Sequence, residues 1–149
     1  MLRDLAADAF EGTSEADSLA AVAALTDPRS LSQVAKTTPH ATVGLRALSG
    51  LSDSHTLGSI SRHALLEVVR VAALEALRVR GDHGEILAVA LNGEFKDSTI
   101  LAVETLTDRE ALDQVIARGR NKHAVRRARA IVREQDAQAV REAARVSAP

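Results

Sequence analysis

The sequence has no cysteine, tryptophan or tyrosine, and its only aromatic residues are Phe10 and Phe95. The absence of cysteine excludes disulfides and thiolate metal sites, and it fits a reducing compartment. The scarcity of aromatics means that aliphatic side chains must form the core, and it leaves few side chains that could stack on a base or a sugar. Alanine, leucine, valine and arginine dominate instead, a mixture that favours helix.

The chain also has no apolar run that approaches the roughly 20 residues of a membrane span. Its N-terminal segment 1–5 (MLRDL) lacks the basic flank and the apolar stretch of a signal peptide. A chain of 149 residues is long enough to bury the core of one domain. We therefore expect a single-domain cytoplasmic protein that does not associate with membranes.

What the sequence does have is a repeat of about 26 residues, a period typical of a solenoid. The start of a unit recurs in three similar segments: 26–31 (TDPRSL), 52–57 (SDSHTL) and 107–112 (TDREAL). The later half of a unit recurs in the same way: 45–48 (LRAL), 71–74 (VAAL) and 100–103 (ILAV). A solenoid supplies surface rather than chemistry, so the repeat predicts architecture more directly than function.

Each unit has the pattern of two short helices. Asp27 followed by Pro28 predicts a helix start, because a carboxylate caps free amides and proline fits the first turn. Pro39 predicts the break before the second helix. Apolar residues recur at constant offsets in the first helices, at Leu5, Leu31, Leu57, Ile86 and Leu112. Small residues recur in the second helices, at Ala21, Ala47, Ala73, Ala102 and Ala128. Such columns predict a continuous core between closely packed helices.

These columns place the units at 1–25, 26–51, 52–77, 78–106 and 107–132, followed by a terminal helix at 133–149. The fourth unit is about three residues longer, and the excess falls in the segment RVRGDHG, where two glycines flank Asp82 and His83. Insertions in a repeat usually form a loop on one face, often the binding face. We therefore expect a protruding turn with Asp82 and His83 as candidate contacts to a ligand, or alternatively a cap for the helix that starts near Glu85.

The fifth unit opens with Thr107, Asp108, Arg109 and Glu110, which is the pattern of a capping box. In a capping box, the threonine hydroxyl and the glutamate carboxylate satisfy two otherwise free amide groups. We interpret this segment as a structural start signal for a helix.

The segment 69–77 (VRVAALEAL) resembles the second-helix motif of the HEAT-like (armadillo-type) α-helical repeat family, a valine–arginine pair followed by alanines and leucines. Thr107 and Asp108 with Leu112 resemble the short-unit HEAT-like arrays of some bacterial proteins. The resemblance covers essentially the whole chain, although the arginine of the motif is replaced in other units, by Gly44, Thr99 and Val125. It implies an all-α fold, a right-handed α-solenoid of about five two-helix repeats plus a C-terminal helix, and a binding module without catalytic residues.

The one strong charge signal is a basic stretch at 118–133. Residues 1–117 hold 10 basic and 17 acidic side chains, whereas 118–133 hold seven basic and no acidic ones. Helical spacing puts three arginines of this stretch on one face, and the other cations precede them in the connecting turn. The candidate residues for binding an anionic partner are Arg118, Arg120, Lys122, Arg126, Arg129 and Arg133. The alternative is a solvated end cap, because the last unit of a solenoid has no neighbour to cover it.

The sequence gives little support for a metal site, a catalytic site or a nucleotide-binding loop. No pair of histidines has the i, i+4 spacing of a helical metal site, and no nucleophile elbow or glycine-rich phosphate loop is present. We therefore predict no metal, no cofactor and no catalytic residues. The sequence favours a scaffold that binds a protein or peptide partner. The alternative is a module that binds the phosphate backbone of a nucleic acid through the basic stretch.

Overall fold

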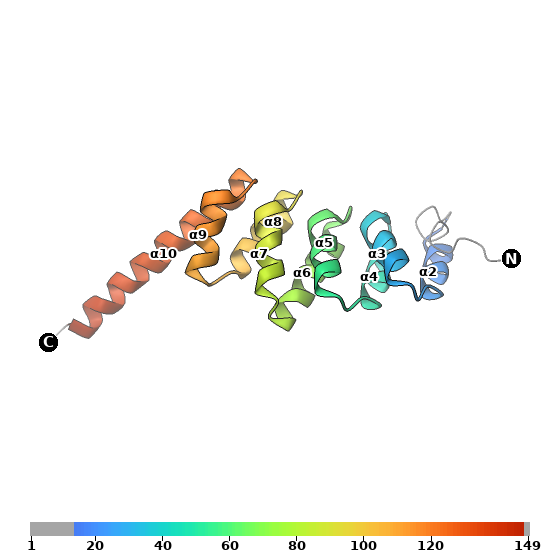
Figure 1. Cartoon of the computed structure of the whole chain (residues 1–149), viewed down its shortest axis with the longest axis horizontal. Coiled ribbons are helices and arrows are strands. Elements are labelled where there is room, and N and C mark those ends of the chain that lie inside the picture. Colours follow the sequence, from blue (N-terminus) through green and yellow to red (C-terminus); the bar gives the residue numbers. More distant parts are fainter. Residues whose placement is uncertain (1–13, 148–149) are drawn as a thin grey trace.

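The computed structural model describes residues 14–147, and all regular structure in this part of the chain is helical (Figure 1). The helices are α2 (Glu15–Ala23), α3 (Pro28–Thr37), α4 (Ala41–Ser49), α5 (Ser54–His63), α6 (Glu67–Arg80), α7 (His83–Asn92), α8 (Lys96–Thr105), α9 (Arg109–Arg118) and α10 (Lys122–Ser147). The predicted all-α class is confirmed. The first helix of the unit at 1–25, with its column residue Leu5, lies outside the described residues.

The helices stack in two rows. In the first row, α3, α5, α7 and α9 contact one another in that order, and in the second row α2, α4, α6, α8 and α10 do the same. Each unit pairs a first-row helix with the second-row helix that follows it in the chain, as α5 does with α6. Figure 1 shows the result as an elongated array with α2 and α10 at opposite ends. Neighbouring helices therefore pack as a helical repeat requires.

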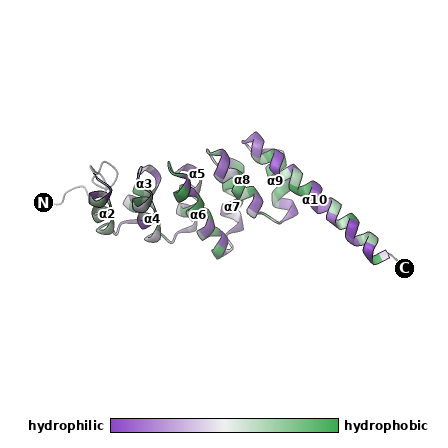
Figure 2. Cartoon of the chain, turned by 180° about the vertical axis from the view of Figure 1, so that it is seen from behind, coloured by the Kyte–Doolittle hydropathy of each residue, from purple (hydrophilic) through white to green (hydrophobic). Residues whose placement is uncertain are grey.

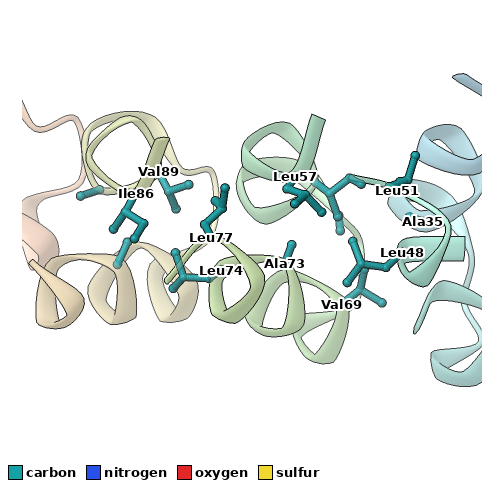
Figure 3. Packing of buried hydrophobic residues seen from close by; sticks show 14 of the residues in the cluster. Ala35, Leu48, Leu51, Leu57, Val69, Ala73, Leu74, Leu77, Ile86 and Val89 are labelled. Atoms are coloured by element: carbon teal, nitrogen blue, oxygen red, sulfur yellow. The ribbon is translucent and has the colours of Figure 1, made fainter. Parts of the chain in front are cut away.

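The core lies between the two rows, where the sequence columns predict it. The first-row column is buried at Leu31, Leu57, Ile86 and Leu112. The second-row column of small residues has no exposed surface at Ala47, Ala73, Ala102 and Ala128. Figure 3 shows side chains of α5, α6 and α7 meeting in this space. Full burial of one such leucine stabilises the fold by roughly 1.5–3 kcal/mol, so the core is the main source of stability.

The corner after each first-row helix has the same geometry. Four residues adopt φ near −60° and ψ near 140° there: Thr38, Ala64, Gly93 and Gly119. Backbone hydrogen bonds join the last three of these corners to the preceding unit, from the amide of Leu65 to the carbonyl of Lys36 (2.8 Å), from Glu94 to Arg62 (3.2 Å) and from Arg120 to Leu91 (3.1 Å). These bonds fix the spacing of consecutive units, and the last of them positions Arg120.

Three of the four described first-row helices begin at an aspartate that caps the first turn, whereas the side chain of Asp82 makes no such bond at the start of α7. The carboxylates of Asp27, Asp53 and Asp108 accept hydrogen bonds from amides of the first turn. The side-chain hydrogen bond from Ser30 lowers the pKa of Asp27, and the backbone hydrogen bond from Thr56 lowers that of Asp53. Because these folded-state pKa values lie below the ordinary 3.8, the stabilisation is present above that pH and is lost as the pH falls through the folded pKa.

The start of α9 does not use the predicted capping box. The amide of Ala111 donates to the carboxylate of Asp108 at 3.2 Å, and Thr107 lies one residue before the cap. We expect Asp108→Ala to lower the free energy of unfolding by about 1 kcal/mol, the usual cost of losing a cap. Thr107→Ala should change it by less than about 0.5 kcal/mol, which urea denaturation of the two variants will measure. A larger loss for Thr107→Ala than for Asp108→Ala would instead indicate that Thr107 caps the helix, as in a capping box.

The extra residues of the fourth unit lengthen α6 instead of forming a long loop. α6 continues to Arg80, and Gly81 ends it with φ of 73°, a left-handed conformation that favours glycine. Only Gly81 and Asp82 separate α6 from α7, because His83 is already helical. The prediction of a loose turn is therefore wrong, since the helix continues through the arginines and valine that precede Gly81, and a short turn follows at the end of the lengthened helix.

The second difference is at the end of the chain. The predicted boundary near residue 133 is absent, and α10 runs without interruption for 26 residues. The segment contains no glycine or proline, and it lacks the aspartate cap that starts α3, α5 and α9. Nothing therefore breaks the helix, which extends beyond the stack (Figure 1).

Candidate anion-binding site

The basic stretch starts at the corner between α9 and α10. Gly119 forms the corner after α9, and Asn121 caps the next helix, because its side-chain oxygen accepts hydrogen bonds from the amides of His123 (2.8 Å) and Ala124 (3.2 Å). The cap fixes where α10 begins. It thereby fixes which basic side chains of α10 lie next to Arg120 in the corner.

A surface hollow of about 390 Å³ lies at this corner, and we call it the basic hollow. Its lining has four cationic side chains over a small apolar floor. The cations are Arg120, Lys122, Arg126 and Arg129, and the floor is Ile116, Gly119 and Val125. The structure thus brings together four of the six predicted basic residues. Arg118 and Arg133 are exposed but do not line the hollow.

None of the six candidate cations has a carboxylate partner within 4.0 Å among residues 14–147. The neighbouring Arg127 differs, because it turns toward α8 and pairs with Glu104 at 3.2 Å. The charge of the basic hollow is therefore not neutralised by the described part of the chain. Unpaired cations that share a hollow favour an anion from outside.

Two further observations indicate a positive potential at this corner. The N-terminal end of α10, with its partial positive charge, begins at Lys122 beside the hollow. The pKa of His123 is lowered, first by burial and then by the nearby charges of Lys96, Lys122 and Arg126. The chemistry of the site is thus recognition of carboxylate or phosphate oxygens by guanidinium and ammonium groups.

The basic side chains are exposed because the stack is open at this end. Arg129 occupies the position held by Leu48, Leu74 and Val103 in earlier units, where those side chains are buried. The helix has not rotated, since Ala124 and Ala128 keep their column positions with no exposed surface. Arg129 is exposed because no further unit covers it within the described part of the chain.

Other arginines do not extend the basic hollow along the array. Arg70 is buried, with 4% of its surface exposed, and it donates hydrogen bonds to corner carbonyls. Arg80 donates to the carbonyl of Ser52, and Arg46 lies on α4 beside Ser49. These side chains form no continuous track, so the strong cation cluster is confined to one end.

The predicted contact residues Asp82 and His83 have side chains that contribute to different surroundings. The carboxylate of Asp82 accepts a hydrogen bond from Ser54 at 2.5 Å and so joins α7 to α5. His83 lines a different hollow of about 470 Å³, between the starts of α7 and α9, together with Asp108 and Glu110. These residues therefore do not form one site.

Sequence reasoning missed two histidine–glutamate pairs that link the third unit to the fourth. Nδ1 of His63 lies 2.9 Å from Glu94, and Nδ1 of His55 lies 3.4 Å from Glu85. The partners are about 30 residues apart, so spacing within one helix gave no signal for them. Within residues 14–147, no three histidine, aspartate or glutamate side chains gather as metal ligands.

In the part of the chain that the structure describes, no helix has the length and apolar character needed to cross a membrane. Comparison with known proteins gives no match: no family model, no curated protein and no solved structure is significantly similar to this chain.

Proposed function

We propose that this protein is a non-catalytic scaffold of the cytoplasm, a right-handed HEAT-like solenoid that binds an acidic segment of a protein partner at its C-terminal end. The observation that carries the proposal is the basic hollow, where four cations without carboxylate partners among residues 14–147 surround a small apolar floor. Such a hollow suits a carboxylate-rich segment, because each guanidinium can donate two parallel hydrogen bonds to one carboxylate.

The distribution of cations supports a protein partner over a nucleic acid. Proteins that bind a phosphate backbone usually have basic side chains along an extended surface, and their binding domain usually has a net positive charge. Here the net charge is −1, Arg70 is buried inside the array, and Arg80 is engaged in a hydrogen bond to the carbonyl of Ser52. A cluster at one end fits a local contact with a peptide segment.

An aliphatic column of the second row leads toward the basic hollow. Equivalent positions of successive units hold partly exposed side chains at Leu19, Leu45, Val71 and Ile100, and Arg126 occupies the same position in the last unit. Single exposed aliphatic residues are ordinary, but a register of them across neighbouring helices forms an apolar stripe. The partner segment that fits has apolar side chains followed by acidic ones.

Fluorescence anisotropy tests the proposal with a labelled peptide whose apolar half precedes a run of glutamates. We expect binding that the triple variant R120E/R126E/R129E reduces at least tenfold, because it replaces attraction by repulsion at three positions. The pKa of His123, followed by NMR, should rise when the peptide binds, since the added negative charge offsets the nearby cations that lower it.

A matched control changes the net charge equally at three exposed arginines elsewhere, in R29E/R46E/R141E, and should bind the peptide as the natural sequence does. Labelled duplex DNA and RNA of equal charge are the comparison probes. Tighter, steeply salt-dependent binding of a nucleic acid would favour the alternative function. Equal loss in both triple variants would show that only net charge matters.

A further inference from the structure

The second half of α10 is a helix without support from the rest of the described chain. α10 has 26 residues and is about 39 Å long, against about 15 Å for the 10 residues of α8. The last ties to another element are the ion pair of Asp136 with Arg109 at 2.9 Å and the hydrogen bond of Gln135 to the carbonyl of Thr107 at 3.2 Å. All residues from Gln138 to Ser147 are exposed. A helical segment of this length is marginal alone in water, so the projecting half needs a partner surface.

One face of α10 carries the surface that such a partner would use. A hollow of about 570 Å³ runs along it, lined only by residues of this helix, and we call it the α10 face. The lining consists of Arg127, Ala130, Ile131, Glu134, Gln135, Gln138, Ala139 and Glu142. Figure 2 shows hydrophobic and hydrophilic residues interspersed along the projecting half. Glu134 and Gln135 lie at the centre of the face, and the small or aliphatic side chains of Ala130, Ile131 and Ala139 on either side allow another helix to approach closely.

The residues of the α10 face are complementary to themselves in an antiparallel arrangement. If a second α10 lies along it with the helix midpoints together, position 127 faces position 142 and position 130 faces position 139. Arg127, which pairs with Glu104 of α8 in its own chain, then meets Glu142 of the second copy as a second carboxylate at both ends of the contact, and Ala130 meets Ala139. Position 131 faces 138, and 134 faces 135, so an isoleucine meets the aliphatic part of a glutamine. The midpoint of the lining coincides with the midpoint of the helix, so the two helices overlap fully.

We propose that the α10 face is a homodimer interface in which two copies of this chain pair their α10 helices antiparallel. In this arrangement the projecting half of each helix covers the half of its partner that lies in the stack. Ion pairs next to the face hold its side chains in place, since Arg141 bonds Glu134 at 3.0 Å and Arg145 bonds Glu142 at 3.4 Å. The contact uses a different part of α10 from the basic hollow, so it stands independently of the proposed function.

Charge reversal with mixing tests both the contact and its direction. Sedimentation velocity of the full chain over a concentration series should show the mass doubling. E142R and R127E should each weaken the dimer about tenfold, because each places like charges opposite each other twice. An equimolar mixture of the two variants should dimerise as the natural chain does, since both contacts of the mixed dimer then pair opposite charges. Circular dichroism of the separate variants should stay unchanged, because both positions are exposed and the intrachain ion pairs that they lose, with Glu104 and Arg145, are exposed pairs that contribute little to stability.

Ala139→Glu and Val140→Glu change neighbouring exposed positions, and the second is the matched control for the first. The first introduces charge on the α10 face, opposite Ala130 of the second copy, and should abolish the dimer, whereas the second lies off the face and should leave it intact. A chain that stays monomeric at every concentration overturns the proposal. A dimer that neither reversal weakens, or one that mixing does not restore, also overturns it, because the contact then lies elsewhere or runs in another direction.

Discussion

Replacing Arg70 by alanine is expected to lower the free energy of unfolding by about 3 kcal/mol, although arginine is ordinarily a surface residue. Nη1 of Arg70 donates to the carbonyls of Ala64 (2.8 Å) and Leu65 (2.9 Å), which lie in the corner between α5 and α6. Nε donates to the hydroxyl of Ser98 on α8 at 3.2 Å. The guanidinium carbon lies 3.8 Å from the centre of the Phe95 ring. One side chain therefore joins a corner of its own unit to the next unit.

The size of the loss follows from what the substitution leaves behind. The carbonyl oxygens of Ala64 and Leu65 would lose charge-assisted hydrogen bonds in a largely buried place, and such bonds contribute about 1.5–3 kcal/mol. The cation–π contact with Phe95 adds about 1 kcal/mol. A cavity of several methylene groups would remain as well. Partial relaxation and water entry offset part of this sum.

Chemical denaturation of three variants separates these contributions. Arg46→Ala is the matched control, because Arg46 is exposed and its side chain makes only a long hydrogen bond to Ser49 (3.5 Å) within residues 14–147, so its loss should stay below about 0.5 kcal/mol. Arg70→Lys keeps the charge but cannot reach both carbonyls and the ring, and should lie between the other two. A loss below about 1 kcal/mol for Arg70→Ala would show that the guanidinium is not buried in solution.

The sequence pattern predicted the stack but not this connection. Arg70 was identified as part of a second-helix motif, yet its column holds Gly44, Thr99 and Val125 in other units. Its acceptors are main-chain carbonyls, which have no sequence signature. Residues with a repeating role, such as Leu57 and Leu112, could be found because the same environment recurs in every unit. Residues with a role in one unit could not.

In the candidate site, too, the sequence predicted the general feature but not the individual contacts. The concentration of positive charge at 118–133 is visible in the sequence, and the structure places four of its members around one hollow. The sequence could not separate Arg127, which pairs with Glu104, from its neighbours, because that choice depends on which side of α10 faces α8. The continuity of α10 was missed because the repeat suggested a boundary near Arg133, while the residues there contain no helix-breaking signal.

Ala73→Leu is expected to lower the free energy of unfolding by about 2 kcal/mol or more, although the substitution adds three apolar carbon atoms to the core. Ala73 has no exposed surface, and its methyl group points from α6 into the space between the rows (Figure 3). α6 packs against α5 in its own unit and against α4 and α8 in the second row. A larger side chain must therefore move a helix or adopt a strained rotamer.

The control is Ala117→Leu on α9, an exposed position where the same change should stay within about 0.5 kcal/mol. Leucine and alanine have similar helix propensity, so the difference between the variants measures packing alone. The repeat makes the prediction stronger, because the small residue recurs at Ala47 and Ala102, which also have no exposed surface. If Ala73→Leu were neutral, the recurring alanine would not be set by the approach of neighbouring helices, and the spacing of the array would have to come from the corner hydrogen bonds instead.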